Sequence, residues 1–308
     1  MAQKPPYQQF TREQLIKKVA PTRWLMKTFV KSMMDLDHAL GKKVIFETDK
    51  GPVTCLTYGF SDPEVKPVLF NMHGGGFVIG SAAMDDPSMP QFADKCGVKV
   101  VNIEYSLSPE VMFPTAVDQC YAVMEYVKAH AAELGVDSDR MMIMGHSAGG
   151  NFCASIGIRE NSEQKLGLKG IILDYPPTDI VTDPYDKPIA KGKGALKPKT
   201  CRVYNQSYCA PDQASDPRIS PAFAQSDQVD HFPPTLVITA QKDSLADEGK
   251  AFADKLKDAG VDVTHRCFED VGHGFTQVGT SMVRPGSKED KAAAEAWKLM
   301  MDFVSTHI

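Results

Sequence analysis

Short runs of apolar residues alternate along the chain with longer stretches in which apolar residues recur every three or four positions. The short runs are typical of β-strands and the longer stretches of amphipathic helices. The predicted strands are residues 44–48, 53–58, 68–70, 98–103, 141–144, 170–173, 236–238 and 263–268. The first two are expected to pair in antiparallel fashion around a turn, and the later runs to form buried strands. The predicted helices are residues 116–134, 148–159, 245–259 and 288–305. This alternation predicts an α/β fold with a mostly parallel central sheet and helices on both faces.

Two segments do not fit this alternation. Residues 11–40 carry apolar side chains at helical spacing but are interrupted by Pro21, which predicts two amphipathic helices joined at the proline. Residues 176–232 are too long for a simple connection and are rich in Pro, Asp, Lys and Ser. We therefore expect an insertion here, near the face of the sheet that carries the functional residues.

The composition restricts the classes of function. The 308 residues are 43% hydrophobic and 24% charged, with a formal net charge of −5. This balance predicts a globular protein and no nucleic-acid or membrane partner. Neither a secretory signal nor an apolar stretch of about 20 residues is visible, so we expect a cytoplasmic protein. The seven cysteines show no Cys-x-x-Cys spacing, which predicts neither disulfides nor a zinc site. We expect no metal or cofactor, and the sequence leaves a homo-oligomer open.

The segment Gly-His-Ser-Ala-Gly at residues 145–149 has the spacing of a nucleophile elbow. It follows the apolar run 141–144 and precedes a predicted helix, which is the context that such a turn requires. The two glycines let strand and helix approach closely while the serine adopts strained backbone angles. The pentapeptide alone is a weak signal, because its residue types are common. Ser147 is therefore a candidate nucleophile that the other motifs must support.

A glycine run, His-Gly-Gly-Gly at residues 73–76, follows the predicted strand 68–70. When a serine attacks an ester, negative charge develops on the carbonyl oxygen, and each backbone N–H aimed at it lowers the barrier by about 3 to 4 kcal/mol. No lysine follows in P-loop register and no dinucleotide-binding pattern opens a helix here. We assign Gly75, Gly76 and Ala148 as oxyanion donors, and His73 as the residue that fixes the glycine loop.

His273 is the candidate general base. It lies just past the last predicted strand, between two glycines, and the ordinary pKa of histidine suits it to take the proton of Ser147 and return it to the leaving group. His146 is adjacent to the serine, but its side chain leaves the turn in another direction. We therefore expect His146 to have a packing role.

Asp243 is the candidate acid that orients the base. It closes the strand predicted at 236–238 and lies between Ser147 and His273 in chain order, as in α/β-hydrolases. Asp247 and Glu248 are rivals, but they belong to the start of the following helix, where the helix dipole alone favours an acid.

Four blocks together resemble the signature segments of the hormone-sensitive-lipase-like (family IV) carboxylesterases. They are residues 73–77, 145–151, 243–249 and 272–275, and the likeness runs from about residue 66 to the end. It includes the segment Tyr-Ser-Leu-Ser-Pro-Glu that begins at Tyr105. The resemblance implies an α/β-hydrolase fold with a helical cap. Residues 1–42 would form N-terminal cap helices, and residues 43–308 a catalytic domain with a cap insertion at about 176–232.

Three positions depart from the family pattern. His146 replaces an acidic residue before the serine, Ser106 replaces an arginine, and Ser244 replaces a proline after the acid. None of them belongs to the candidate triad. They leave the contacts of the cap and loops, and therefore the acyl preference, open.

The sequence predicts a serine carboxylesterase that hydrolyses small-molecule esters through an acyl-enzyme. The resemblance implies short acyl chains, from acetyl to about hexanoyl. Phe77, Phe223 and Phe275 are candidates for the substrate pocket, with a core role equally open. A peptidase or amidase, or a binding protein that lost catalysis, shares this fold. The first would need a further substrate-filtering domain, and the second predicts a damaged triad.

Overall fold

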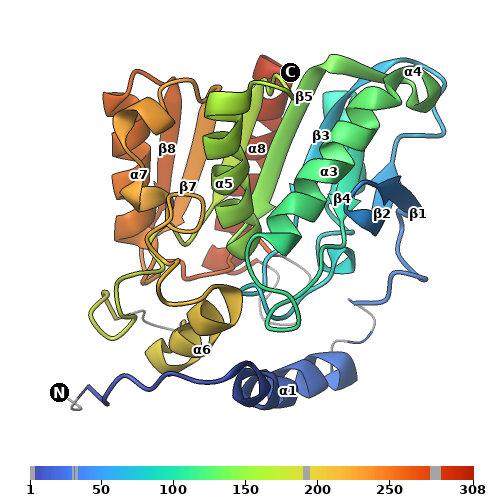
Figure 1. The fold of residues 1–308 in the computed structure, drawn as a ribbon. Helices are drawn as coiled ribbons and strands as arrows, with labels where there is room; N and C mark the ends of the chain where they lie inside the picture. Colours follow the sequence, from blue (N-terminus) through green and yellow to red (C-terminus); the bar gives the residue numbers. More distant parts are fainter. Residues whose placement is uncertain (1–3, 30, 32–33, 190–194, 278–285) are drawn as a thin grey trace.

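The computed structural model describes residues 4–29, 31, 34–189, 195–277 and 286–308, and its centre is an eight-stranded sheet (Figure 1). The strands are β1 (Lys42–Thr48), β2 (Gly51–Tyr58), β3 (Lys66–Met72), β4 (Lys99–Ile103), β5 (Val136–His146), β6 (Gly170–Asp174), β7 (Thr235–Ala240) and β8 (Val263–Phe268). Their order is β1-β2-β4-β3-β5-β6-β7-β8. The strands β3 to β8 run parallel, whereas β1 pairs with β2, and β2 with β4, in antiparallel direction.

Helices cover both faces of this sheet, as the alternation of elements predicts. They are α1 (Arg12–Phe29), α2 (Met89–Cys96), α3 (Thr115–Ala129), α4 (Ala131–Leu134), α5 (Ala148–Glu163), α6 (Pro198–Tyr208), α7 (Ala246–Asp258) and α8 (Lys288–His307), with the 3-10 turns η2 (Ala82–Met84), η3 (Pro221–Phe223) and η4 (Ser226–Gln228). The helices α3, α5 and α7 pack on one face, and α2 and α8 on the other. The predicted α/β-hydrolase architecture, with a mostly parallel sheet between two helical layers, is confirmed.

The central strand β5 shows why a buried parallel strand is apolar throughout. Met141 and Ile143 belong to the core under α3 and α5, while Met142 and Met144 belong to the core under α8. All four side chains are fully buried, because neighbouring side chains of a strand point to opposite faces and both faces are covered.

The last strand corrects one expectation. We predicted a buried strand at 263–268, but β8 is the final strand of the sheet, and its side chains alternate between partly buried and exposed positions. Cys267 is exposed, whereas Phe268 is buried. An edge strand needs one sheltered face only, so a short apolar run does not distinguish it from an interior strand.

Two predictions were also wrong about the number of helices that a segment forms. The segment 116–134 forms two helices, α3 and α4, that meet at His130. At the other end of the chain, α1 is one helix that continues through Pro21, so two helices do not meet at the proline. Leu15 and Val19 are buried before the proline, whereas Trp24 is 64% exposed after it.

The helices α1 and α6 lie together across the end of the sheet at which the parallel strands finish (Figure 1). The amide N–H of Phe10 donates to the Gln206 side-chain oxygen at 2.9 Å, and the Gln206 amide donates to the carbonyl of Gln8 at 3.0 Å. These contacts bring residues from the N-terminal segment and from the insertion to the same end of the sheet. No helix within the described residues is long and apolar enough to cross a membrane.

Candidate active site

The turn between β5 and α5 places Ser147 in a conformation that few residues adopt. Its φ is 52° and its ψ is −113°, and its N–H donates to the carbonyl of Asp174 at 2.8 Å. A Cβ on Gly145 would lie 2.3 Å from the backbone of Gly149, and a Cβ on Gly149 would lie 2.0 Å from the carbonyl oxygen of Met72. The turn therefore requires both glycines, because strand and helix approach more closely than any side chain permits.

Three candidate residues from distant parts of the sequence form one hydrogen-bonded chain. The Oγ of Ser147 lies 2.8 Å from Nε2 of His273, and Nδ1 of His273 lies 2.6 Å from Oδ2 of Asp243. A carboxylate only accepts, so Nδ1 carries the proton and Nε2 is left to accept from the serine hydroxyl. The serine follows β5, the aspartate follows β7 and the histidine follows β8. The carboxyl ends of these parallel strands lie at the same end of the sheet, which brings the three residues together.

The environment of His273 adjusts its proton affinity. Burial favours the neutral imidazole and would lower its pKa, but the charge of Asp243 and its hydrogen bond outweigh this effect, so the pKa of His273 is raised above 6.5. The charges of Asp174 and Glu248 act in the same direction. The site therefore stabilises the imidazolium that a general base becomes after it takes a proton.

The glycine loop after β3 has a backbone that only glycine fits. Gly75 has a φ of 131° and Gly76 a φ of 57°. A Cβ on Gly75 would lie 1.9 Å from the carbonyl oxygen of Ile79, and a Cβ on Gly76 would lie 2.1 Å from the ring of Tyr204. Both glycines line the same cavity as Ser147. Ala148 begins α5, where the first N–H groups of a helix have no partner within it.

His73 contacts the loop rather than the candidate nucleophile. Its Nδ1 lies 2.7 Å from the carbonyl of Gly74, and its ring stacks on Tyr105 with the centroids 4.1 Å apart. The Tyr105 hydroxyl donates to the carbonyl of His73 at 2.6 Å. These contacts support its expected role of fixing the glycine loop.

A cavity of about 530 Å³ opens above Ser147 and His273, in the size range of small-molecule sites. Phe77 and Phe275 line it, and each is 3% exposed. The third candidate, Phe223, is not among the residues that line this cavity. It lies in the short turn η3 and is 40% exposed. Among the described residues, no group of three or more His, Cys, Asp or Glu side chains is placed to hold a metal ion.

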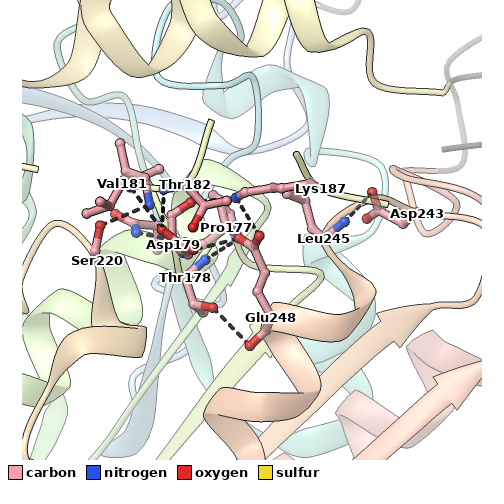
Figure 2. Close-up of polar contacts among 12 residues, drawn as sticks. Pro177, Thr178, Asp179, Val181, Thr182, Lys187, Ser220, Asp243, Leu245 and Glu248 are labelled. Atoms are coloured by element: carbon pink, nitrogen blue, oxygen red, sulfur yellow. Dashed lines mark hydrogen bonds and ion pairs between the residues drawn. The ribbon is translucent and has the colours of Figure 1, made fainter. Parts of the chain in front are cut away.

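The insertion contributes cavity residues that the sequence analysis did not identify, notably Lys187 and Tyr204. The sequence favours a solvated loop for Lys187, whose side chain is only 9% exposed in the structure. Tyr204 lies in α6, a helix that the sequence analysis did not predict. The Lys187 ammonium is joined to Glu248 of α7 at 2.5 Å and donates to the carbonyl of Asp179, as Figure 2 shows. Glu248 also accepts from the N–H of Thr178 at 2.8 Å. This cluster fastens the insertion to the helix that follows Asp243.

The acids near Asp243 have different environments. Burial raises the pKa of Glu248 despite the opposing effect of Lys187, whereas the rival candidate Asp247 is exposed in the first turn of α7. Asp243 itself accepts from the N–H of Leu245 at 3.2 Å, which is drawn beside the cluster in Figure 2. The structure therefore brings Asp243, and not Asp247, to the imidazole of His273.

The residue before the serine, His146, forms a second histidine–aspartate pair. Its Nδ1 lies 2.7 Å from Oδ2 of Asp174, and both side chains are fully buried. Burial alone would lower the pKa of His146, but the charges of Asp85 and Asp174 raise it. The sequence analysis assigned His146 to packing and did not identify Asp174, which no motif contains.

The two other departures from the family pattern have simpler surroundings. Ser106 donates its backbone N–H to the side chain of Gln119 at 2.9 Å. Ser244 lines the cavity directly after the candidate acid.

Comparison with known proteins shows the family to which the chain belongs. The sequence pattern of the α/β hydrolase fold matches residues 69–277. The chain is 30% identical to an ethyl acetate hydrolase of Pseudomonas putida over 69% of this chain and 67% of that protein. It is 33% identical to human (Homo sapiens) hormone-sensitive lipase over 38% of this chain and 11% of the lipase. The crystal structure of the carboxylesterase EstE1, cloned from a metagenomic library, superposes with a TM-score of 0.79 at 28% identity, covering 97% of this chain and 98% of the other.

The chain therefore belongs to the α/β-hydrolase superfamily and, within it, to the hormone-sensitive-lipase-like (family IV) carboxylesterases, a group of carboxylic ester hydrolases. The matched segment spans 57 to 67% of the length of four curated relatives.

Proposed function

We propose that this protein is a serine carboxylesterase for small-molecule esters of short acyl chains. Ser147 attacks the ester carbonyl while His273 takes its proton, and Asp243 holds the imidazole in the required orientation. The N–H groups of Gly75, Gly76 and Ala148 stabilise the negative charge on the carbonyl oxygen. His273 then returns the proton to the departing alcohol, and water releases the acid from the acyl-enzyme.

The observation that carries this proposal is the continuous hydrogen-bonded chain from Ser147 through His273 to Asp243, in which Ser147 and His273 line the cavity. A nucleophile and its base must be within hydrogen-bond reach, and the base must be oriented by a third group. Both distances satisfy this condition, and the esterase relatives support the reaction class.

We further propose that residues 1–42 and about 176–232 act as a cap that limits the acyl chain. Met26 of α1 and Tyr204 of α6 both line the cavity. Arg23 of α1 donates to the carbonyl of Val78, close to the glycine loop, at 2.7 Å. A wall built from two separate segments encloses the acyl side of the cavity and favours acetyl to about hexanoyl esters.

The principal test is Ser147→Ala, with Ser155→Ala as its matched control. Ser155 lies two turns further along α5, is also buried, and has no hydrogen-bond partner for its hydroxyl among the described residues. With p-nitrophenyl acetate, Ser147→Ala should lose activity by about 10⁴-fold or more, and Ser155→Ala should retain it. Substantial turnover by Ser147→Ala would refute the mechanism.

The acyl preference is tested with p-nitrophenyl esters from acetate to decanoate. A steep fall in kcat/KM beyond about hexanoate is expected if the cap closes the acyl side of the cavity. Equal rates along the series would contradict the cap proposal and favour a lipase. The corresponding p-nitroanilides distinguish an esterase from an amidase on the same fold.

A further inference from the structure

The buried carboxylate of Asp174 joins the two loops that carry the candidate nucleophile and base. Its Oδ2 lies 2.7 Å from Nδ1 of His146, the residue directly before Ser147. The same oxygen accepts from the hydroxyl of Thr276 at 2.5 Å, three residues after His273. Its other oxygen, Oδ1, has no hydrogen-bond partner among the described residues. Both contacts therefore converge on one atom.

The backbone of the same residue adds a third connection. The carbonyl oxygen of Asp174 accepts from the N–H of Ser147 at 2.8 Å. Asp174 ends β6, which is the neighbour of β5 in the sheet. The nucleophile turn is thus held from the backbone and the side chain of one residue on the adjacent strand.

The contacts on the side of His273 extend this connection to the imidazole ring. The single hydroxyl proton of Thr276 is used toward Asp174, so the hydroxyl of Tyr175 must donate to Thr276 across their 2.6 Å separation. The ring of Tyr175 meets the imidazole of His273 edge-on, with the centroids 4.9 Å apart. In addition, Trp297 of α8 donates to the carbonyl of Thr276 at 2.7 Å.

These side chains are sealed from solvent. Asp174, His146 and Thr276 are fully buried, and Tyr175 is 1% exposed. A charged group buried in this way holds its partners strongly, because the low local dielectric strengthens the hydrogen bonds and breaking them leaves a charge without compensation. The linkage therefore resists relative movement of the loops that it connects.

We propose that Asp174 and Thr276 are positioning residues that hold the imidazole of His273 at hydrogen-bond distance from Ser147. This proposal rests on the proposed function, in which His273 must take the proton of Ser147. It also gives His146 a role. This residue stands where the family usually has an acid, and its hydrogen bond connects Asp174 to the nucleophile turn. Loss of the linkage should slow the chemical step, because misplacement by about 1 Å costs up to about 100-fold in rate.

The test compares Thr276→Val with Thr276→Ser. Valine keeps the shape of threonine but cannot bond Asp174 or Tyr175, so kcat should fall about tenfold or more while KM stays within about twofold. Serine restores the hydroxyl, and kcat should return to within about threefold of the wild type. The matched control is Thr235→Val. Thr235 is equally buried, but its hydroxyl donates to the carbonyl of Pro233 at the start of β7, the end of the strand away from Asp243.

The outcomes separate positioning from general stability and from the function itself. The proposal is overturned if Thr276→Val keeps its kcat, if Thr276→Ser does not recover, or if Thr235→Val loses as much. Should Thr276→Val fail to fold, Tyr175→Phe removes the adjoining hydroxyl alone. Its kcat should fall about threefold, and an unchanged kcat would overturn the proposal. Ser147→Ala is assayed in parallel. Its loss of activity would support the proposed esterase function independently of the results for the Thr276 variants.

Discussion

The molecule contains two histidine–aspartate pairs of almost equal geometry but different surroundings. The distance from Nδ1 to Oδ2 is 2.6 Å between His273 and Asp243, and 2.7 Å between His146 and Asp174. His273 is partly accessible from the cavity and presents Nε2 to the hydroxyl of Ser147. His146 is fully buried, and its Nε2 has no hydrogen-bond partner in the described part of the chain. A histidine–aspartate pair alone therefore does not identify a general base. The group that faces Nε2 of the histidine decides whether the imidazole can take a proton.

The largest expected effect belongs to the accessible pair. Asp243→Asn should lower kcat by about 10⁴-fold, because an amide at this position favours the tautomer in which Nε2 cannot accept the serine proton. Steady-state kinetics with p-nitrophenyl acetate measure the loss, and a thermal melt close to that of the wild type verifies the fold. A loss below about tenfold would show that Asp243 does not orient the base.

The next effect concerns the buried pair. Asp174→Asn should lower the free energy of unfolding by about 3 kcal/mol, because it weakens two hydrogen bonds to a buried charge. Urea unfolding at pH 7 measures the change, with Asp243→Asn as the comparison. The Asp243 side chain is also buried, but an asparagine carbonyl can still accept from the N–H of Leu245, and His273 borders the cavity, so we expect a loss of at most about 1 kcal/mol. Equal losses in both variants would remove the distinction between the two pairs.

The pH dependence of activity should follow His273. Its raised pKa means that the neutral base is depleted as the pH falls, so kcat/KM should decrease at least about 30-fold between pH 8 and pH 5. A rate profile over this range measures the midpoint, which should lie above 6.5. A midpoint well below 6.5 would contradict the interaction between His273 and Asp243.

Stability should change with pH in the opposite direction and by the smallest amount. The pKa of His146 is raised in the folded state by Asp85 and Asp174 against the effect of burial. Its stabilising contribution is therefore complete below the unfolded pKa of about 6.5 and is lost as the pH rises through the folded pKa. The free energy of unfolding should fall by at most about 1.4 kcal/mol per pH unit for this group. The pKa of His273 is also raised, so the measurement is made in a His273→Asn background. A free energy of unfolding that rises with pH in this background would contradict the raised pKa of His146.

Much of the fold and of the candidate site could be predicted from local patterns. The apolar run at Met141–Met144 and the glycines around Ser147 predict a strand and a tight turn, because both depend on the burial and size of neighbouring side chains. The glycine loop and the loop with His273 are equally local, since each is marked by glycines beside a polar residue. These features needed no knowledge of which strands are neighbours.

Other features depend on contacts that no local pattern contains. Asp174 is linked to Thr276 across 102 positions of sequence, and neither belongs to a motif. The continuation of α1 through Pro21 and the exposure of β8 depend on what packs against them. The 40% exposure of Phe223 is likewise not marked by its residue type.

The sequence by itself determined the alternation of strands and helices, the glycines that permit two tight turns, and the identity of the candidate nucleophile, base and acid. These properties follow from side-chain size, polarity and spacing, which act over a few residues. The tertiary structure alone decided that His146 pairs with Asp174 in the interior, and that this buried carboxylate ties the two loops together. Such choices depend on the order and register of the parallel strands, because the sheet brings residues a hundred positions apart within hydrogen-bond distance.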